Sequence, residues 1–366
     1  MNILYLTTHV NVGGITSYLR FLSAGMVQKG HTVCLASSTG TLVPEFQRQG
    51  VRFVPVPIKT KSIASPKVLM SACMLYSYLK KNRIDIIHAN TRVTQVLACI
   101  LSRLCGVPYL STCHGFFKAR FLRRRIPCWG FRVIAISESV RQHLIEDLKV
   151  EPQLIRLVYS GIDTEVFSAQ RGIASSVAKQ ALGLGEGPVI GIIARLSDVK
   201  GHLYLIQAMK DVVQEFPRAQ LLIVGEGRMK KELVALTRSL GLLGRVVFLP
   251  HTEDVAATLS LLDVFVMPSL KEGLGLGLME AMAAGVAVVG SAVGGIKDLI
   301  QDGHNGLLVE PANPGKLAEA ICGLLKDEGR RRRMGANACD LIRQRFSVNK
   351  MVDQTEGVYT ECLNVA

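Results

Sequence analysis

Two successive series of short apolar segments, joined by a small and polar stretch, constrain the fold of this chain most. Each segment is rich in β-branched residues, and most are followed by a helix-like pattern, which is typical of buried parallel strands. The first series is NILYLT, HTVCLAS, RFVPVP, DIIHAN, PYLSTCH and RVIAIS, and the second is PVIGIIAR, AQLLIVGEG, RVVFLP, VFVMPS, VAVVGS and GLLVEP. This alternation predicts two α/β domains, each with a doubly wound parallel sheet.

The domain boundaries follow from the gap between the two series. A chain of 366 residues also exceeds the size at which one core keeps growing, which favours two domains. The join is predicted in the polar, glycine-bearing stretch Ser168 to Pro188. We therefore expect a first domain over residues 1–167, a second over 168–347, and a C-terminal helix over 348–366 that packs back toward the first domain.

Positive charge is concentrated in the first half of the chain. Residues 1–160 contain 21 Lys and Arg against 6 Asp and Glu, whereas residues 161–366 contain 22 against 23. The excess is densest around Lys59 and Lys61, in Lys80 to Arg83, and in HGFFKARFLRRRIPCWGF, where aromatic and basic residues interleave. Such a surface would attract the phosphates of an anionic membrane, although a solvated basic loop is the alternative. No nucleic-acid-binding signature accompanies the charge, so we expect no nucleic acid partner.

The remaining composition bears on location and metals. The segment MNILYLTTHV lacks a basic start and polar residues cut its apolar run short, unlike a signal peptide. The longest uncharged run, Ala281 to Ile296, is too short and glycine-rich to span a bilayer. We expect a cytoplasmic protein that can associate peripherally with the inner face of the membrane. Nine cysteines without a CxxC pair fit reduced thiols better than disulfides or a zinc site. We expect no metal and no cofactor.

Two motifs place phosphate-binding groups at the ends of predicted strands, where ligands bind in doubly wound sheets. Gly13 and Gly14 follow the first strand and precede a helix predicted to start near Ile15 to Ser17. Paired glycines there let backbone N–H groups approach an anion, although a plain tight turn would also explain them. Arg195 and Lys200 follow the first strand of the second series and could clamp a diphosphate. An exposed basic loop is the alternative.

The stretch MPSLKEGLGLGLMEAMAAG places two carboxylates in an apolar, glycine-rich setting. Glu272 lies in the predicted loop after the strand VFVMPS. If the following helix begins near Gly275, Glu280 lies in its second turn, where an unpaired carboxylate would be costly to bury. Glu280 could accept hydrogen bonds from the two hydroxyls of a ribose, and Glu272 could face a sugar beyond the phosphates. Alternatively, Glu280 complements the helix dipole and Glu272 is solvated.

Taken together, these residues resemble the retaining glycosyltransferases of family 4, which have the GT-B fold. The resemblance rests on Glu272 and Glu280 with seven residues between them, followed by EAMAAGVAVVGSAVGGIKDLI and DGHNGLLVEP. Further matching blocks occur in order: Gly13 and Gly14, CHG at Cys113 to Gly115, AISES, SGID, ARLSDVKG and VGEG. The resemblance covers essentially the whole chain. It implies two Rossmann-like domains that face a central cleft.

The resemblance also implies a reaction and a role for each matching residue. A nucleotide-diphosphate sugar (UDP or GDP) would be held mainly by the second domain, and a saccharide or lipid-linked acceptor by the first, as in cell-envelope or surface polysaccharide synthesis. Arg195 and Lys200 would neutralise the diphosphate, Glu280 would hold the ribose, and Glu272 and His114 would lie beside the transferred sugar. Backbone N–H groups would meet the phosphates or the sugar at Gly13, Gly14, Gly273, Leu274, Gly275 and Leu276. No metal is needed in such enzymes.

Two other functions fit the same architecture. A sugar-nucleotide epimerase would convert the donor without an acceptor, but Arg195, Lys200 and this spacing of glutamates fit it poorly. A non-catalytic nucleotide-sugar-binding subunit would keep Glu280 while losing the basic clamp or His114, and all of these residues are present.

Overall fold

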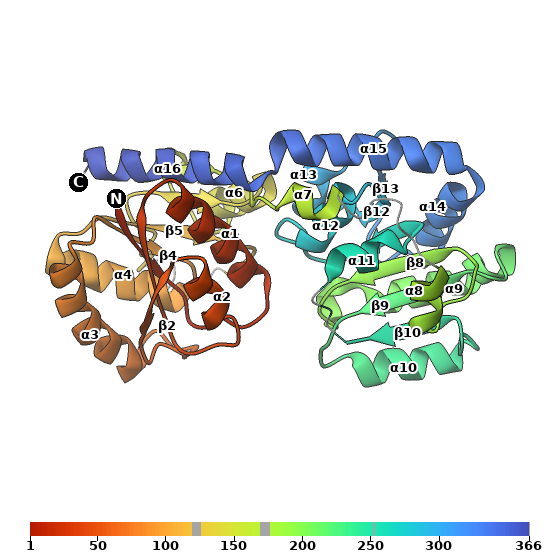
Figure 1. Ribbon diagram of the computed structural model, residues 1–366, viewed down its shortest axis with the longest axis horizontal. Helices are drawn as coiled ribbons and strands as arrows, with labels where there is room; N and C mark the ends of the chain where they lie inside the picture. Colours follow the sequence, from red (N-terminus) through yellow and green to blue (C-terminus); the bar gives the residue numbers. More distant parts are fainter. Residues whose placement is uncertain (119–125, 169–175, 251, 253, 366) are drawn as a thin grey trace. The chain divides into compact units, whose positions relative to one another are not determined.

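The computed structural model describes residues 1–118, 126–168, 176–250, 252 and 254–365. The chain divides into two compact units (Figure 1): Met1–Gly161 with Val348–Ala366, and Ile162–Ser347. Each unit is built on one parallel β-sheet with helices packed on it. The predicted fold class, two doubly wound α/β domains, is confirmed.

The sheet of the first unit has seven strands in the order β3-β2-β1-β4-β5-β6-β7. All neighbouring strands pair in parallel. The strands are β1 (Asn2–Leu6), β2 (Thr32–Ser37), β3 (Arg52–Pro55), β4 (Ile86–Ala89), β5 (Tyr109–Cys113), β6 (Val133–Ala135) and β7 (Ile155–Leu157). Every residue of β4, β5 and β6 is buried, as expected for parallel strands covered on both faces.

Helices cover both faces of this first sheet. Alternate residues of β1 separate the two faces, since Ile3 and Tyr5 join one apolar cluster whereas Leu4 and Leu6 join another. The first cluster includes side chains of α1, α2 and α16, and the second includes side chains of α3 and α4. The helices of this unit are α1 (Gly14–Gln28), α2 (Val43–Arg48), α3 (Pro66–Asn82), α4 (Arg92–Cys105), α6 (Glu138–Glu146) and α16 (Val348–Val365).

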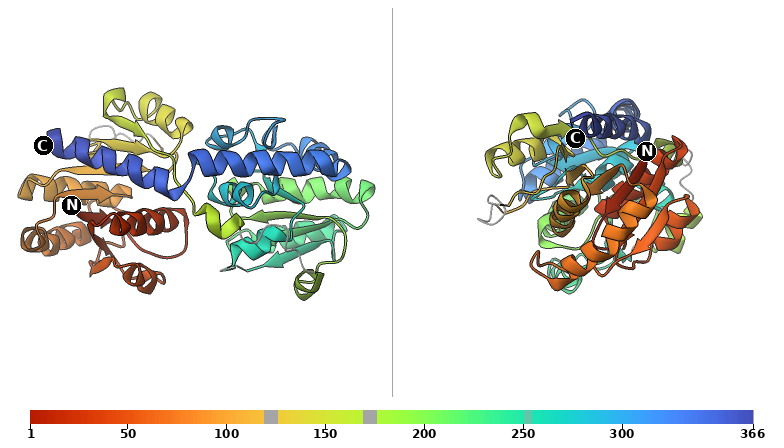
Figure 2. Two further views of the ribbon diagram at one scale, coloured as in Figure 1. Left: turned by 45° about the horizontal axis from the view of Figure 1, so that its top comes forward. Right: turned by 90° about the vertical axis from the view of Figure 1, so that its left-hand side faces the viewer.

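The C-terminal helix α16 belongs to the first unit and lies against α1, which Figures 1 and 2 show in dark blue and red. The two helices approach closely at Gly25, where an added Cβ would lie 2.4 Å from a methyl carbon of Val352. Ion pairs also hold α16, because Glu356 accepts from Lys29 at 2.5 Å and Glu361 pairs with Arg156 at 2.6 Å. The last segment of the chain thus completes the core of the first unit.

The sheet of the second unit has six parallel strands in the order β10-β9-β8-β11-β12-β13. The strands are β8 (Val189–Ile193), β9 (Gln220–Val224), β10 (Val246–Leu249), β11 (Val264–Met267), β12 (Ala287–Ser291) and β13 (Leu307–Val309). The helices are α7 (Thr164–Ser168), α8 (Ser176–Ala181), α9 (His202–Glu215), α10 (Lys230–Ser239), α11 (Val255–Ser260), α12 (Leu276–Ala283), α13 (Ile296–Leu299), α14 (Pro314–Lys326) and α15 (Glu328–Arg345). Apolar side chains of α9, α10 and α14 share one buried cluster with β8.

The boundary between the units lies after Gly161, earlier than the predicted boundary after residue 167. Ile162 already belongs to the second unit, since its N–H donates to the carbonyl of Phe346 at 3.0 Å. The short helix α7 follows and packs against α12. The two boundaries differ because the prediction relied on the polar composition after Ser168, whereas Ile162 and α7 already contact other parts of the second unit.

In both sheets the order of the strands reverses at one point, between β1 and β4 in the first unit and between β8 and β11 in the second. The loops that leave the carboxyl ends of these adjacent strands therefore diverge to opposite faces and leave a crevice, where ligands bind in such sheets. In the described part of the chain, no helix has the length and apolar character needed to cross a membrane.

Candidate functional site

The loops after β8 and β11 bring two of the predicted residues of the second unit together. Lys200 ends a short 3-10 helix, Asp198–Lys200, and Glu272 lies in the loop after β11. Lys200 Nζ donates to Glu272 Oε2 at 2.5 Å, and the two side chains are only 20% and 12% exposed. The loops are also joined through the backbone, since the N–H of Leu270 donates to the carbonyl of Val199 at 2.8 Å. The result is a partly buried ion pair at the crevice of the sheet.

Gly201 permits this close approach of the two loops. It has φ +70°, a left-handed conformation that glycine adopts without strain. A Cβ at Gly201 would lie 1.8 Å from the carbonyl oxygen of Pro268, the residue that follows β11. No side chain larger than hydrogen therefore fits at this position without moving the Glu272 loop. The sequence reasoning missed this role, although a glycine directly after Lys200 was a visible signal.

Ser269 is a second residue that the sequence reasoning missed. It is fully buried, and its Oγ donates to Glu272 Oε2 at 3.2 Å. Glu272 thus receives a charged donor from Lys200 and a neutral donor from Ser269. Both bonds restrict the carboxylate to one orientation at the mouth of the crevice.

The helix α12 follows this loop, and its start agrees closely with the prediction. Gly275 is its N-cap with φ +105°, and Glu280 lies in the second turn and is half-buried. The first turn contains no acidic residue, and no side-chain hydrogen bond caps it. Gly273, Leu274, Gly275 and Leu276 thus lead into a helix N-terminus whose backbone N–H groups favour an anion.

Arg195 lies immediately beyond β8 and is exposed, on a loop supported by two glycines. A Cβ at Gly225 would lie 2.1 Å from the carbonyl oxygen of Ala194, and one at Gly227 would lie 2.1 Å from that of Leu196. The VGEG segment therefore has a structural explanation here, because its glycines let the Arg195 loop pack onto the loop after β9.

In the first unit, Gly13 and Gly14 lie at the crevice after β1. The helix α1 begins at Gly14, just before the predicted start at Ile15 to Ser17. Both glycines are exposed, and a Cβ added at either would meet no atom within 4 Å. The first turn of α1 contains no acidic residue and receives no side-chain cap. This arrangement leaves space for an anion at the helix N-terminus.

His114 lies directly after β5, at the carboxyl end of the same sheet. Its Nε2 lies 3.1 Å from Oδ1 of Asn90, and the ring of Tyr18 packs edge-on at 4.8 Å between ring centroids. Burial lowers the pKa of His114 to about 3. The ring is therefore neutral at physiological pH and donates from Nε2 to Asn90. Asn90, which is buried after β4, was also missed by the sequence reasoning.

A buried hydrogen-bond network lies beneath His114 and reaches α16. The ring of Tyr18 contacts His114, and its hydroxyl lies 3.3 Å from Oγ1 of Thr112. Thr112 and the hydroxyl of Tyr359 on α16 each lie 2.7 Å from a ring nitrogen of His88. Burial lowers the pKa of His88 to about 3. A neutral imidazole thus connects the C-terminal helix to the residues that hold His114.

Both imidazoles should make the stability of the first unit dependent on pH. Their pKa values are lower in the fold than in the unfolded chain, so their contribution is fully present above about pH 6.5 and is lost as the pH falls toward 3. For each ring, the free energy of unfolding should decrease by about 1.4 kcal/mol for every unit by which the pH falls below about 6.5. We expect the thermal midpoint of the wild type to decrease when the pH is lowered from about 7.5 to about 5.5. The midpoint of His114→Gln should decrease less over the same range. The exposed residue His304 provides the control His304→Gln, which should retain the wild-type slope. A wild-type midpoint that is unchanged over this range would contradict the prediction.

The structure describes only the two ends of the basic aromatic segment HGFFKARFLRRRIPCWGF. Arg120, Phe121 and Arg123 to Arg125 lie outside the described residues. Trp129 is only 5% exposed and belongs to the interior, so the expectation that it is presented on the surface was wrong. Lys118, in contrast, is exposed.

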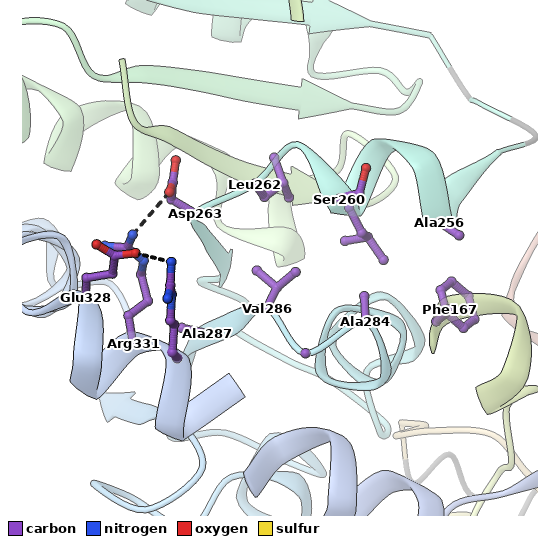
Figure 3. Close-up of a pocket in the computed structure, with 13 residues that line it drawn as sticks. Phe167, Ala256, Ser260, Leu262, Asp263, Ala284, Val286, Ala287, Glu328 and Arg331 are labelled. Carbon is purple, nitrogen blue, oxygen red and sulfur yellow. Dashed lines mark hydrogen bonds and ion pairs between the residues drawn. The ribbon is translucent and has the colours of Figure 1, made fainter. Parts of the chain in front are cut away.

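A cavity of about 340 Å³ occurs at a different place in the second unit (Figure 3). Asp263 and Val286, which line it, directly precede β11 and β12, so it lies at the amino ends of these strands. Arg331 lies 3.4 Å from Asp263 on its wall. The cavity contains none of the predicted site residues, which all lie at the carboxyl ends. Within the described ranges, no three His, Cys, Asp or Glu side chains are grouped as metal ligands would be.

Family models match both units. The model of the glycosyl transferases group 1 matches residues 176–340, and that of Glycosyltransferase Family 4 matches residues 12–166. The chain is 27% identical over 333 residues to an Escherichia coli UDP-Gal:alpha-D-GlcNAc-diphosphoundecaprenol alpha-1,3-galactosyltransferase, covering 87% of this chain and 86% of that protein. It is 28% identical over 371 residues to the N-acetyl-alpha-D-glucosaminyl L-malate synthase of Bacillus anthracis, covering 98% and 96%.

Solved structures share the fold across the whole chain. Anabaena HepE, crystallised with UDP and glucose, superimposes with a TM-score of 0.86 at 24% identity, covering 98% of this chain and 99% of that one. At this level of identity the similarity establishes the architecture of the two units.

Proposed function

The chain belongs to the family 4, group 1 glycosyltransferases of the GT-B type, and we propose that it moves a sugar from a UDP- or GDP-linked donor to a saccharide or lipid-linked acceptor with retention of the anomeric configuration. The observation that carries the proposal is the Lys200–Glu272 pair at the crevice of the second sheet, beside the uncapped N-terminus of α12. A cation, a carboxylate and a helix N-terminus at one sheet edge suit a diphosphate joined to a sugar.

We propose that the bound donor replaces the contact between Lys200 and Glu272, so that each of these side chains contacts the donor instead. The diphosphate would take Lys200, with Arg195 and the N-terminus of α12 as further groups that stabilise its charge. Glu272 would then accept hydrogen bonds from hydroxyls of the sugar while Ser269 keeps it oriented. The existing ion pair therefore holds both side chains near the positions that the donor requires, which lowers the cost of ordering them on binding.

In the proposed reaction, the bond between the anomeric carbon and the β-phosphate oxygen breaks, and its electron pair stays on the diphosphate. The acceptor oxygen bonds to the same carbon, and its proton passes to the departing diphosphate. Arg195 and Lys200 stabilise the charge that develops on the leaving group, so the chain's own cations perform this task and we propose no metal. We assign His114, a neutral hydrogen-bonding group, to the reacting sugar.

The acceptor is proposed to be lipid-linked, in the synthesis of a cell-envelope or surface polysaccharide. The name of the Escherichia coli relative specifies a diphosphoundecaprenol-linked acceptor. The first unit also carries the excess of basic residues, which suits an anionic membrane surface. Each of these observations supports a reaction close to a lipid leaflet.

Removal of the carboxylate of Glu280 should weaken donor binding strongly. A hydrogen bond to a charged group contributes about 1.5 to 3 kcal/mol, so Glu280→Ala should raise the Kd about tenfold or more. A thermal shift across UDP-, GDP- and ADP-sugars measures this. At about 100 times the wild-type Kd, the matching donor should stabilise the wild type by about 2.7 kcal/mol and the variant by about 1.4 kcal/mol or less.

The matched control is Glu319→Ala on α14, whose carboxylate is exposed and pairs only with the neighbouring Lys316 in the described structure. It should respond to the donor as the wild type does. If the Glu280→Ala shift equals that of the wild type, the ribose assignment is wrong. Conversion of the donor into an isomeric nucleotide sugar, without an acceptor and without nucleotide release, would instead favour an epimerase.

A further inference from the structure

One helix of the first unit exposes an apolar surface to solvent. In α3, Val68, Leu75 and Leu79 point into the core, and the opposite side carries large apolar side chains. Leu69 is 63% exposed, Met70 56% and Met74 52%, and Cys73 between them is also exposed. We call these four residues the α3 face. What distinguishes the α3 face from other exposed apolar side chains is that four of them lie together on one side of a helix, and a grouped apolar surface of this kind marks an interaction site.

Lysines flank the α3 face at both ends. Lys59, Lys61 and Lys67 lie at its N-terminal end, where Lys67 Nζ donates to the carbonyl of Lys59 at 3.5 Å. Lys80 and Lys81 lie in the last turn. All five are exposed, and no Asp or Glu occurs anywhere from residue 59 to residue 84. The surface therefore combines an apolar strip with charge of one sign only.

We propose that the α3 face docks on an anionic lipid leaflet, with the helix lying in the plane of the interface. Helices that bind in this way have an apolar side and lysines beside it, whose long stems bury while their ammonium groups reach the lipid phosphates. A protein partner would need matching carboxylates and a shaped apolar pocket, whereas a leaflet supplies fluid chains beneath a layer of phosphates. The uniform positive charge and the flexible Leu and Met side chains fit the leaflet.

The position of α3 connects this surface to the proposed reaction. The N-terminus of α3 follows β3, so it lies at the carboxyl edge of the sheet, the same edge as Gly13 and His114. An acceptor anchored in the leaflet would thus be presented to that edge. Its use for catalysis rests on the proposed function, whereas the binding to lipid does not.

Flotation with lipid vesicles tests the proposal on the full chain. We expect the wild type to float with vesicles that contain phosphatidylglycerol and far less with pure phosphatidylcholine, and the bound fraction should fall as salt is raised. The triple variant Leu69→Ser, Met70→Ser, Met74→Ser should bind about tenfold or more weakly. The matched control is Val166→Ser, Leu243→Ser, Val365→Ser, whose side chains are 53%, 62% and 59% exposed elsewhere on the chain. It should float as the wild type does.

Three results would overturn the proposal. The wild type could fail to float with either vesicle, the α3 variant could float as well as the wild type, or sedimentation could show a dimer that the α3 variant alone disrupts. The donor-induced thermal shift, measured without vesicles, should be the same in the wild type and the α3 variant, which also shows that the variant is folded. A protein that floats through α3 but responds to no donor would reject the proposed function and leave this inference in place.

Discussion

Replacement of Lys200 with alanine is expected to lower kcat/KM for sugar transfer about 100- to 1,000-fold, the loss typical when one group that stabilises developing charge is removed. Two effects add in this variant. The departing diphosphate loses a cation, and Glu272, which is only 12% exposed, loses the charged partner 2.5 Å away. The carboxylate would then repel the diphosphate that Lys200 had attracted. Because both effects grow as charge develops on the leaving group, most of the loss should appear in kcat rather than in KM.

Steady-state rates of donor turnover, measured over a range of donor concentrations, check this prediction. Lys316→Ala is the matched control, since Lys316 also pairs with a glutamate, at 2.8 Å, but on the exposed surface of α14. Its kcat/KM should stay at the wild-type value. If Lys200→Ala retained more than about one tenth of wild-type kcat/KM, Lys200 would be a structural partner of Glu272 and not a group that acts on the diphosphate.

Gly201→Ala should strongly destabilise the fold of the second unit. The new Cβ would lie 1.8 Å from the carbonyl oxygen of Pro268, and an alanine at φ +70° is also strained. Left-handed backbone alone costs about 1 to 2 kcal/mol for a residue other than glycine. Relief of the clash must separate the Lys200 loop from the Glu272 loop. We therefore expect a loss of unfolding free energy well beyond the backbone cost, together with loss of donor binding.

Gly303→Ala isolates the clash from the backbone strain. Gly303 has φ +74°, almost the same as Gly201, but a Cβ there would meet no atom within 4 Å. It should therefore lose only about 1 to 2 kcal/mol and keep full donor binding. Denaturant unfolding and the donor-induced thermal shift measure both quantities. If both variants lost the same amount of unfolding free energy and of donor binding, the close contact between Gly201 and Pro268 would contribute nothing to either quantity.

Twelve strands of the structure were predicted from the apolar segments, but β7 (Ile155–Leu157) was missed. It is three residues long, its middle residue is Arg156, and only Ile155 is buried. A strand at the edge of a sheet, as β7 is, has one neighbour and needs less apolar character than a central strand. The pattern that identifies buried strands therefore cannot detect it.

Some residues of the candidate site could be identified from local sequence, and others could not. Arg195, Lys200, Glu272 and Glu280 were identified by their positions after apolar strands, which local sequence records directly. Ser269 and Asn90 were not, because a buried serine or asparagine is identified only by its partner. Trp129 was misplaced on the surface because an aromatic residue among basic ones has no periodic pattern that reports its burial.

The sequence by itself determined the two α/β domains, the strands at their centres and the loops that carry the charged residues, because side-chain periodicity and glycine placement act over a few residues. Only the tertiary structure decided which of these groups meet. Lys200 and Glu272 are 72 residues apart in the chain and pair because β8 and β11 are neighbours at the point where the strand order reverses. Tyr359 reaches His88 across 271 residues because α16 returns to the first unit. Contacts of this range depend on how whole elements pack, which no local pattern encodes.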